Sequence, residues 1–126
     1  MDEPVPSLEG RLRTSFRRVC VTGGAGFIGS HLVDGFRRAG MSVSVLDDLS
    51  TGRLENLAHH ASEIDFIEGS VEDASARDAA VADCDLVMHL ASRVSVVESM
   101  ADPALYRRVV GDGTRDMLES AAAAGA

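Results

Sequence analysis

Residues 22–29 read Thr-Gly-Gly-Ala-Gly-Phe-Ile-Gly, and this stretch decides the fold of the chain. Three of its glycines, Gly23, Gly26 and Gly29, have the spacing Gly-x-x-Gly-x-x-Gly. We expect Gly23 to allow a tight exit from a strand and Gly29 to let a helix lie close against a sheet. Gly26 has no Cβ, so a pyrophosphate group can approach the backbone there. The motif predicts a phosphate-binding turn between a strand and a helix.

The residues on both sides of this turn have the periodicity that it requires. Residues 18–22 form a short β-branched run, which is typical of a buried parallel strand. Residues 27–39 carry apolar side chains at helical spacing, and Gly40 follows as a helix stop. We expect the N–H groups of Phe27 and Ile28 to point toward the phosphates, aided by the positive end of the helix dipole.

Strands and helices alternate along the rest of the chain. We predict further strands over residues 41–46, 64–68 and 85–91, and helices over residues 54–61, from Asp73 or Ser75 through Val81, and over residues 103–123. This alternation indicates βαβ units and a parallel sheet. The predicted fold class is therefore α/β, a Rossmann-like parallel sheet with flanking helices, truncated after about four strands.

An acidic residue closes the second predicted strand. Asp47 follows Gly29 by eighteen residues, the distance at which a carboxylate reaches the adenosine ribose of a bound dinucleotide. A carboxylate there accepts hydrogen bonds from both ribose hydroxyls and repels a 2′-phosphate. The pattern therefore favours NAD over NADP as the cofactor. A glycine-rich turn without any ligand is the alternative interpretation.

Acidic residues outnumber basic ones, twenty against twelve, and the formal net charge is -8. This balance argues against nucleic acid or an anionic membrane surface as a partner, because both favour a basic protein. No apolar run approaches the ~20 residues of a membrane-spanning helix. Cys20 and Cys84 fit no metal-ligand spacing, so we expect buried free thiols and a cytoplasmic location.

Four segments together resemble one known family. They are residues 21–32, residues 47–52, the sequence His-Leu-Ala-Ser at 89–92, and Asp102-Pro103 with Tyr106 and Gly113-Thr114. In combination they resemble the N-terminal part of the NAD-dependent epimerase/dehydratase family, within the extended short-chain dehydrogenase/reductases. Within that family, the sequence most resembles the nucleotide-sugar epimerases. The resemblance covers about residues 18 to 123, nearly the whole chain.

The resemblance implies a set of cofactor contacts. The pyrophosphate would lie against Gly23, Gly26, Phe27 and Ile28, the adenosine ribose against Asp47, Asp48, Leu49, Ser50 and Thr51, the adenine against Ser70 and Val71, and the nicotinamide side against Leu90, Ala91 and Ser92. Enzymes of this family act mostly on nucleotide sugars and use NAD as a transient hydride store. The implied ligands are thus NAD and, in a full-length relative, a nucleotide sugar.

The sequence departs from the family where the chemistry takes place. The family uses a Tyr-x-x-x-Lys pair, in which the lysine lowers the pKa of the tyrosine so that it acts as a general base. The chain has no lysine, and its only tyrosine, Tyr106, is followed four residues later by Val110. Val109-Val110 occupies a position where the family usually has asparagine, and Ser70 one where it has aspartate. We therefore expect no catalytic residue in the chain and no catalytic competence for the chain alone.

These patterns divide the chain into two parts. Residues 1–16 hold two of the three prolines and little periodicity, so we expect a flexible N-terminal arm. Residues 17–126 are expected to form an incomplete NAD(P)-binding Rossmann domain, without the catalytic half or the substrate domain.

Three histidines invite a functional interpretation. His59 and His60 are adjacent, but neighbouring helical residues face different ways and no acid is suitably spaced, so we expect solvated side chains and no metal site. His89 ends a predicted buried strand, where a packed and hydrogen-bonded histidine is expected. Arg93 and Glu98 fall in a segment that faces substrate in the family, and solvated surface is the alternative there.

The expected strand order, 3-2-1-4-5 without its fifth strand, leaves the strand at residues 86–91 as an edge. An apolar edge strand is a template for pairing, so a homo-oligomer or a complementing chain is a candidate partner. Three functions stay open at this point. The chain is the NAD-binding part of a nucleotide-sugar epimerase or dehydratase, a non-catalytic NAD-sensing or partner-complemented module, or a non-functional gene fragment.

Overall fold

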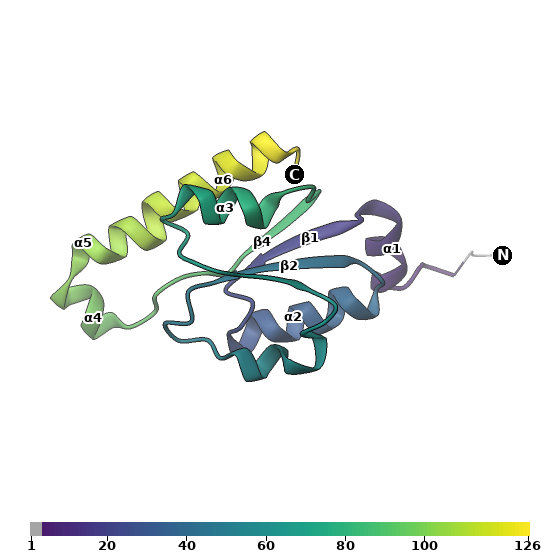
Figure 1. Ribbon diagram of the computed structural model, residues 1–126, viewed down its shortest axis with the longest axis horizontal. Coiled ribbons are helices and arrows are strands. Elements are labelled where there is room, and N and C mark those ends of the chain that lie inside the picture. Colours follow the sequence, from purple (N-terminus) through teal and green to yellow (C-terminus); the bar gives the residue numbers. More distant parts are fainter. Residues whose placement is uncertain (1–3) are drawn as a thin grey trace.

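Four parallel strands form the sheet in the computed structural model, which describes residues 4–126 (Figure 1). They are β1 (Arg18–Thr22), β2 (Ser42–Asp47), β3 (Asp65–Glu68) and β4 (Leu86–His89), and their order in the sheet is β3-β2-β1-β4. All three neighbouring pairs are parallel. The predicted fold class and strand order are confirmed, and β4 is an edge strand.

Helices cover both faces of the sheet (Figure 1). One face carries α2 (Phe27–Arg38) and the 3-10 helix η1 (Leu54–His60), and the other carries α3 (Ala74–Val81) and α6 (Gly113–Ala124). Alternate residues of β1 follow this division. Val19 packs in the cluster that contains Phe36 of α2, whereas Cys20 packs in the cluster that contains Met117 of α6.

The two central strands are buried on both faces, as the apolar runs at residues 18–22 and 42–47 predict. The polar side chains among them have partners. Ser44 donates a hydrogen bond to the carbonyl oxygen of Ala80, and it also contacts Cys84. Cys20 and Cys84 are buried and free, as predicted. Burial raises the pKa of the Cys20 thiol to about 12, so this thiol is protonated and inert at neutral pH.

The segment predicted as a loose arm contains a helix, α1 (Leu8–Ser15). Ser7 caps it, because its hydroxyl accepts a hydrogen bond from the N–H of Gly10 at 3.2 Å. Leu12 and Phe16 pack against the cluster on the α2 face. The expected arm therefore contains a helix over residues 8–15, and the apolar contacts of Leu12 and Phe16 with the folded domain compensate for the weak helical periodicity of the segment.

The last predicted helix, over residues 103–123, is confirmed, but it is not a regular α-helix throughout. It consists of α5 (Pro103–Tyr106), the π-helix η2 (Arg107–Asp112) and α6. A further short helix, α4 (Val96–Ala101), precedes it and is not among the predicted elements. Its cap is Ser95, whose hydroxyl accepts from the N–H of Glu98. π-helical turns often occur beside functional sites, and η2 contributes Val109 to the cleft described below.

Across residues 4–126, the structure contains no helix with the length and apolarity needed to span a membrane.

Candidate functional site

A cleft of about 320 Å³ lies at the carboxyl ends of β1, β2 and β4. The chain leaves β1 for β2, which pairs with one side of β1, whereas β4 pairs with the other side of β1. The cleft therefore lies at a topological switch point, where ligands of such sheets bind. Thirteen of the fourteen residues predicted to contact a cofactor line it: Gly23, Gly26, Phe27, Ile28, Asp47, Asp48, Ser50, Thr51, Ser70, Val71, Leu90, Ala91 and Ser92. The lining also includes Leu46, Gly69 and Val94, which the sequence does not predict.

The glycines of the turn differ in what requires them. Gly23 has φ +70°, a left-handed conformation, and a Cβ there would lie 3.0 Å from the nitrogen of Ala91. A Cβ on Gly29 would overlap the carbonyl oxygen of Gly23 and lie 2.8 Å from the Cα of Gly24. Gly26 has an ordinary φ of -77°, and the single atom near a Cβ would be the Gly23 oxygen at 3.3 Å. The fold needs glycine at 23 and 29 more than at 26.

The N-terminus of α2 opens into the cleft without a side-chain cap. Gly26 is its N-cap and has no side chain that could accept a hydrogen bond. The N–H groups of Phe27 and Ile28 lie in the first turn, where a helix has no partners of its own to offer. These N–H groups and the positive end of the helix dipole make this end of α2 suited to an anion.

Asp47 binds the glycine turn itself. Its Oδ2 accepts a hydrogen bond from the N–H of Ala25 at 2.9 Å, and its Oδ1 accepts one from the N–H of Leu49 at 2.9 Å. The side chain is buried at 8% exposure. Each carboxylate oxygen has a further lone pair that a ribose hydroxyl could use. Asp47 is therefore a positioning residue of the turn as well as a candidate ligand contact.

A second segment holds the same turn from the outside. The amide of Asn56 donates to the carbonyl oxygen of Ala25 at 2.8 Å, and the N–H of Arg53 donates to that oxygen at 3.0 Å. Ala25 is fully buried. Sequence reasoning misses Asn56, because it lies 31 residues from Ala25 in the chain. A polar residue within a short helix gives no signal of such a contact.

In the loop after β2, the residues predicted to contact the ribose face different directions. Asp48 is exposed, and its Oδ1 accepts hydrogen bonds from both the N–H and the hydroxyl of Ser50. Leu49 has φ +59°, and its side chain packs against the core cluster of the α2 face. Leu49 is the one predicted residue that does not line the cleft. Its neighbours alternate with it, so they face the cleft while Leu49 faces inward.

His89 anchors the opposite wall. Its Nδ1 lies 2.7 Å from the hydroxyl of Thr22, and its Nε2 lies 3.1 Å from the hydroxyl of Thr114. Burial lowers the pKa of His89, so the ring is neutral. The Thr22 hydroxyl also accepts from the N–H groups of Leu90 and Ala91. The prediction of a packed, hydrogen-bonded histidine is confirmed, and the network fixes the chain that leaves β4.

Two further contacts shape the far side of the cleft. Val71 is buried and packs against Gly113 of α6, where a Cβ would lie 2.9 Å from its Cγ2. Arg93 lines the cleft and forms an ion pair with Glu98 at 2.9 Å, and the hydroxyl of Tyr106 donates to the same carboxylate. Tyr106, the lone tyrosine, is thus engaged in holding the loop after β4.

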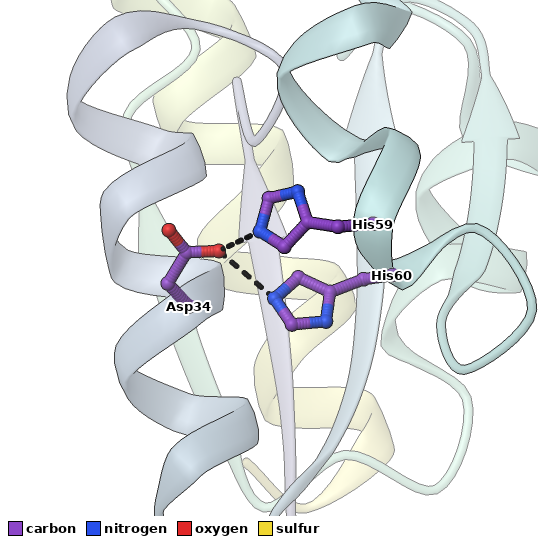
Figure 2. A group of neighbouring side chains, drawn as sticks. All are labelled: Asp34, His59 and His60. Atoms are coloured by element: carbon purple, nitrogen blue, oxygen red, sulfur yellow. Dashed lines mark hydrogen bonds and ion pairs between the residues drawn. The ribbon is translucent and has the colours of Figure 1, made fainter.

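His59 and His60 have an acid partner that the sequence does not indicate, so that part of the prediction is wrong, whereas His59 is solvated as expected, with a side chain 58% exposed. Both imidazoles lie against one acid, Asp34 of α2, with Nε2 to Oδ1 distances of 2.7 Å and 2.8 Å (Figure 2). The side chain of His60 is 15% exposed. The acid lies 25 residues from His59 in the sequence, so no local spacing could indicate it. Imidazoles are also long enough to reach one oxygen from adjacent positions at the end of η1.

Comparison with known proteins identifies the family to which this chain is similar. Residues 19–126 match the family described as "NAD dependent epimerase/dehydratase family". The chain is 40% identical over 111 residues to UDP-glucose 4-epimerase of Mycolicibacterium smegmatis, a match that covers 86% of this chain and 36% of that protein. It is 41% identical over 102 residues to dTDP-glucose 4,6-dehydratase of the same organism, with 77% of this chain and 31% of that protein covered.

A solved structure is similar in both sequence and shape. The crystal structure of Thermus thermophilus UDP-glucose 4-epimerase in complex with NAD matches with a TM-score of 0.77 and 37% identity, over 86% of this chain and 34% of that one. The chain therefore spans about a third of the length of the relatives that it matches. Because the family match takes in far more than half of its residues, the chain belongs to the NAD-dependent epimerase/dehydratase family.

Proposed function

We propose that the cleft binds NAD, with the pyrophosphate at the N-terminus of α2 and the adenosine ribose at the loop after β2. The observation that carries this proposal is Gly26. A Cβ at this position would meet a single atom, the Gly23 oxygen at 3.3 Å, and the fold excludes it less strictly than at Gly23 or Gly29. The residue is nevertheless glycine, it faces the cleft, and it caps a helix whose first N–H groups lack side-chain acceptors. A phosphate that must approach the backbone explains all three features.

We also propose that NAD is preferred over NADP. Two carboxylates, Asp47 and Asp48, line the cleft at the carboxyl end of β2. A 2′-phosphate placed there would meet negative charge on both sides, whereas ribose hydroxyls can donate to the remaining lone pairs. No lysine exists in the chain to offset that charge, and the one arginine among the residues that line the cleft, Arg93, is paired with Glu98.

We propose that this cofactor-binding region belongs to an enzyme that epimerises or dehydrates a nucleotide sugar. In the first case the enzyme is an isomerase. The similarity to UDP-glucose 4-epimerase and dTDP-glucose 4,6-dehydratase supports the substrate class. With Tyr106 tied to Glu98 and no lysine in the sequence, the chain lacks a Tyr-x-x-x-Lys pair, so we expect no turnover from it alone. The free buried cysteines support a cytoplasmic location.

One observation favours a second candidate, a binding module completed by another chain or by a second copy. β4 pairs with β1 on one side, and within residues 4–126 no strand pairs with its other side. All four residues of β4 are only half-buried. A strand from a partner could pair there and complete the wall of the cleft beyond Leu90.

Calorimetric titration of NAD and NADP into the purified chain tests the cofactor proposal, after light scattering has given its mass in solution. We expect micromolar NAD binding, weaker NADP binding, and loss of NAD binding in Gly26→Ala, because the methyl group fills the phosphate position. Gly35→Ala is the matched control, since its Cβ meets nothing within 4 Å. Absence of NAD binding by a folded chain would overturn the proposal and leave the gene-fragment alternative. A dimeric mass would support pairing through β4.

A further inference from the structure

We propose that Asp34, His59 and His60 form a binding site for a divalent transition-metal ion such as Zn²⁺. The three side chains come from two elements, Asp34 from α2 and the histidines from the end of η1, and they point toward one another (Figure 2). One ligand atom from each lies within 4.8 Å of the others. None of the three lines the cleft, so this site is separate from the proposed cofactor site.

The donor atoms are gathered at hydrogen-bonding distances, which are shorter than the ligand separations of a metal site. The Nε2 atoms of His59 and His60 lie 2.7 Å and 2.8 Å from Oδ1 of Asp34. In a tetrahedral zinc site with bonds of about 2.0–2.1 Å, ligand atoms lie about 3.3 Å apart. An ion would therefore need the carboxylate to recede by about 0.5 Å, a displacement that a small side-chain rotation supplies.

The surroundings of His60 favour a cation at its Nε2. Its Nδ1 lies 3.4 Å from Oε2 of Glu63, and its Nε2 faces Asp34, so both ring nitrogens face carboxylate oxygens. Carboxylates accept and do not donate, and a neutral imidazole has a single N–H. With a metal ion on Nε2 and the proton on Nδ1, a neutral ring satisfies both acids. This is the carboxylate–histidine–metal arrangement that orients ligands in zinc sites.

The charge of the cluster also suits a cation. Two imidazoles meet one carboxylate oxygen, Oδ1 of Asp34, and a second carboxylate, Glu63, lies beside Nδ1 of His60. Two imidazoles and one carboxylate are ligands for zinc, nickel or copper rather than for magnesium or calcium.

An ion can reach this site from solvent. The side chains of His59 and Asp34 are 58% and 31% exposed, whereas His60 is 15% exposed. Three protein ligands leave the fourth tetrahedral position to water. A bound ion would tie the end of η1 to α2, and η1 carries Asn56, which holds the glycine turn.

Titration of Zn²⁺ into the metal-free chain without NAD tests the site. We expect one Zn²⁺ per chain, and visible absorption of a tetrahedral complex when Co²⁺ replaces Zn²⁺. His60→Gln and Asp34→Asn each weaken binding by about tenfold or more, and Glu63→Gln weakens it by about tenfold through the orientation of His60. His31→Gln is the matched control, because it removes an imidazole from α2 outside the cluster.

Three results would overturn the proposal. One is a folded chain, by circular dichroism, that binds no Zn²⁺ at millimolar concentration, which would show that the cluster takes protons only. Another is equal loss of binding in His31→Gln and His60→Gln, the signature of surface imidazoles without a formed site. The third is an unchanged Zn²⁺ affinity in Asp34→Asn, which would place the ion away from the cluster. None of these measurements depends on whether the cleft binds NAD.

Discussion

The two halves of α2 are held in place in different ways. The first turn packs backbone against backbone, because Gly29 lies directly over the carbonyl of Gly23 with no space for a side chain. The second half is held by side chains, with Val33 and Phe36 in the core and Asp34 against two histidines. Gly35, in this second half, meets nothing within 4 Å of where its Cβ would be.

This difference shows that glycine can have different structural roles at different positions of one helix. Gly29 and Gly35 are six residues apart in the same helix, yet close approach requires the first, whereas no neighbour requires the second. In the first half, close backbone packing excludes a side chain at Gly29. In the second half, the side chains themselves make the contacts that hold the helix. Substitutions in the two halves should therefore differ in size and sign.

The largest effect is expected from Gly29→Ala. The new methyl group would overlap the Gly23 carbonyl, a backbone group that no rotamer change can move. Overpacking costs about 1–3 kcal/mol, and we expect the upper end of that range here, which exceeds the helix-propensity gain of about 1 kcal/mol. Urea unfolding measures the loss of stability. An unchanged unfolding midpoint would show that the turn can move away from the helix, and the contrast between the two halves would then fail.

A smaller loss is expected from Asp47→Asn, which removes charge from the clamp on the glycine turn. The carboxylate accepts from two N–H groups, and an amide would present an N–H to one of them. Hydrogen bonds to a charged group contribute about 1.5–3 kcal/mol, but asparagine keeps one acceptor oxygen, so we expect a loss of about 1.5 kcal/mol. Asp48→Asn is the matched control at the next residue. Asp48 is exposed, and asparagine there keeps its Oδ1 acceptor for Ser50. An equal loss of stability in Asp48→Asn would contradict the role of the Asp47 carboxylate in holding the glycine turn.

Gly35→Ala should change stability in the opposite direction from Gly29→Ala. The added methyl group meets no neighbour, and alanine is favoured over glycine inside a helix by about 0.5–1 kcal/mol. The same urea experiment should show an increase in the free energy of unfolding. A decrease would mean that Gly35 has a packing role that its surroundings do not indicate.

The smallest effect is expected from Asp34→Asn, measured in EDTA. The pKa of Asp34 is lowered in the folded chain, so its contribution is present above the ordinary carboxylate pKa and is lost as pH falls through the folded value. We expect a loss below about 1 kcal/mol at neutral pH, since the pair is partly exposed. Stability profiles of the two proteins should converge below about pH 4. A constant difference at all pH values would exclude the charge as its cause.

Much of the fold and the cleft could be predicted from the sequence. The Gly23–Gly26–Gly29 spacing locates the turn, and alternation of apolar runs locates all four strands. The unpredicted elements, α1 and α4, are short and depend on single caps at Ser7 and Ser95. Family resemblance places Leu49 in the ribose loop, but the left-handed backbone at that residue directs its side chain toward the core.

The order of the four strands, the glycine turn after the first of them and the absence of lysine can all be read from the sequence. These depend on periodicity, on glycine spacing and on composition, all of which are local in the chain. Only the tertiary structure decided that Asp34 meets His59 and His60, that Asn56 holds Ala25, and that His89 joins Thr22 to Thr114. Each of these contacts joins residues more than twenty positions apart, and packing of separate elements alone brings such side chains within hydrogen-bonding distance.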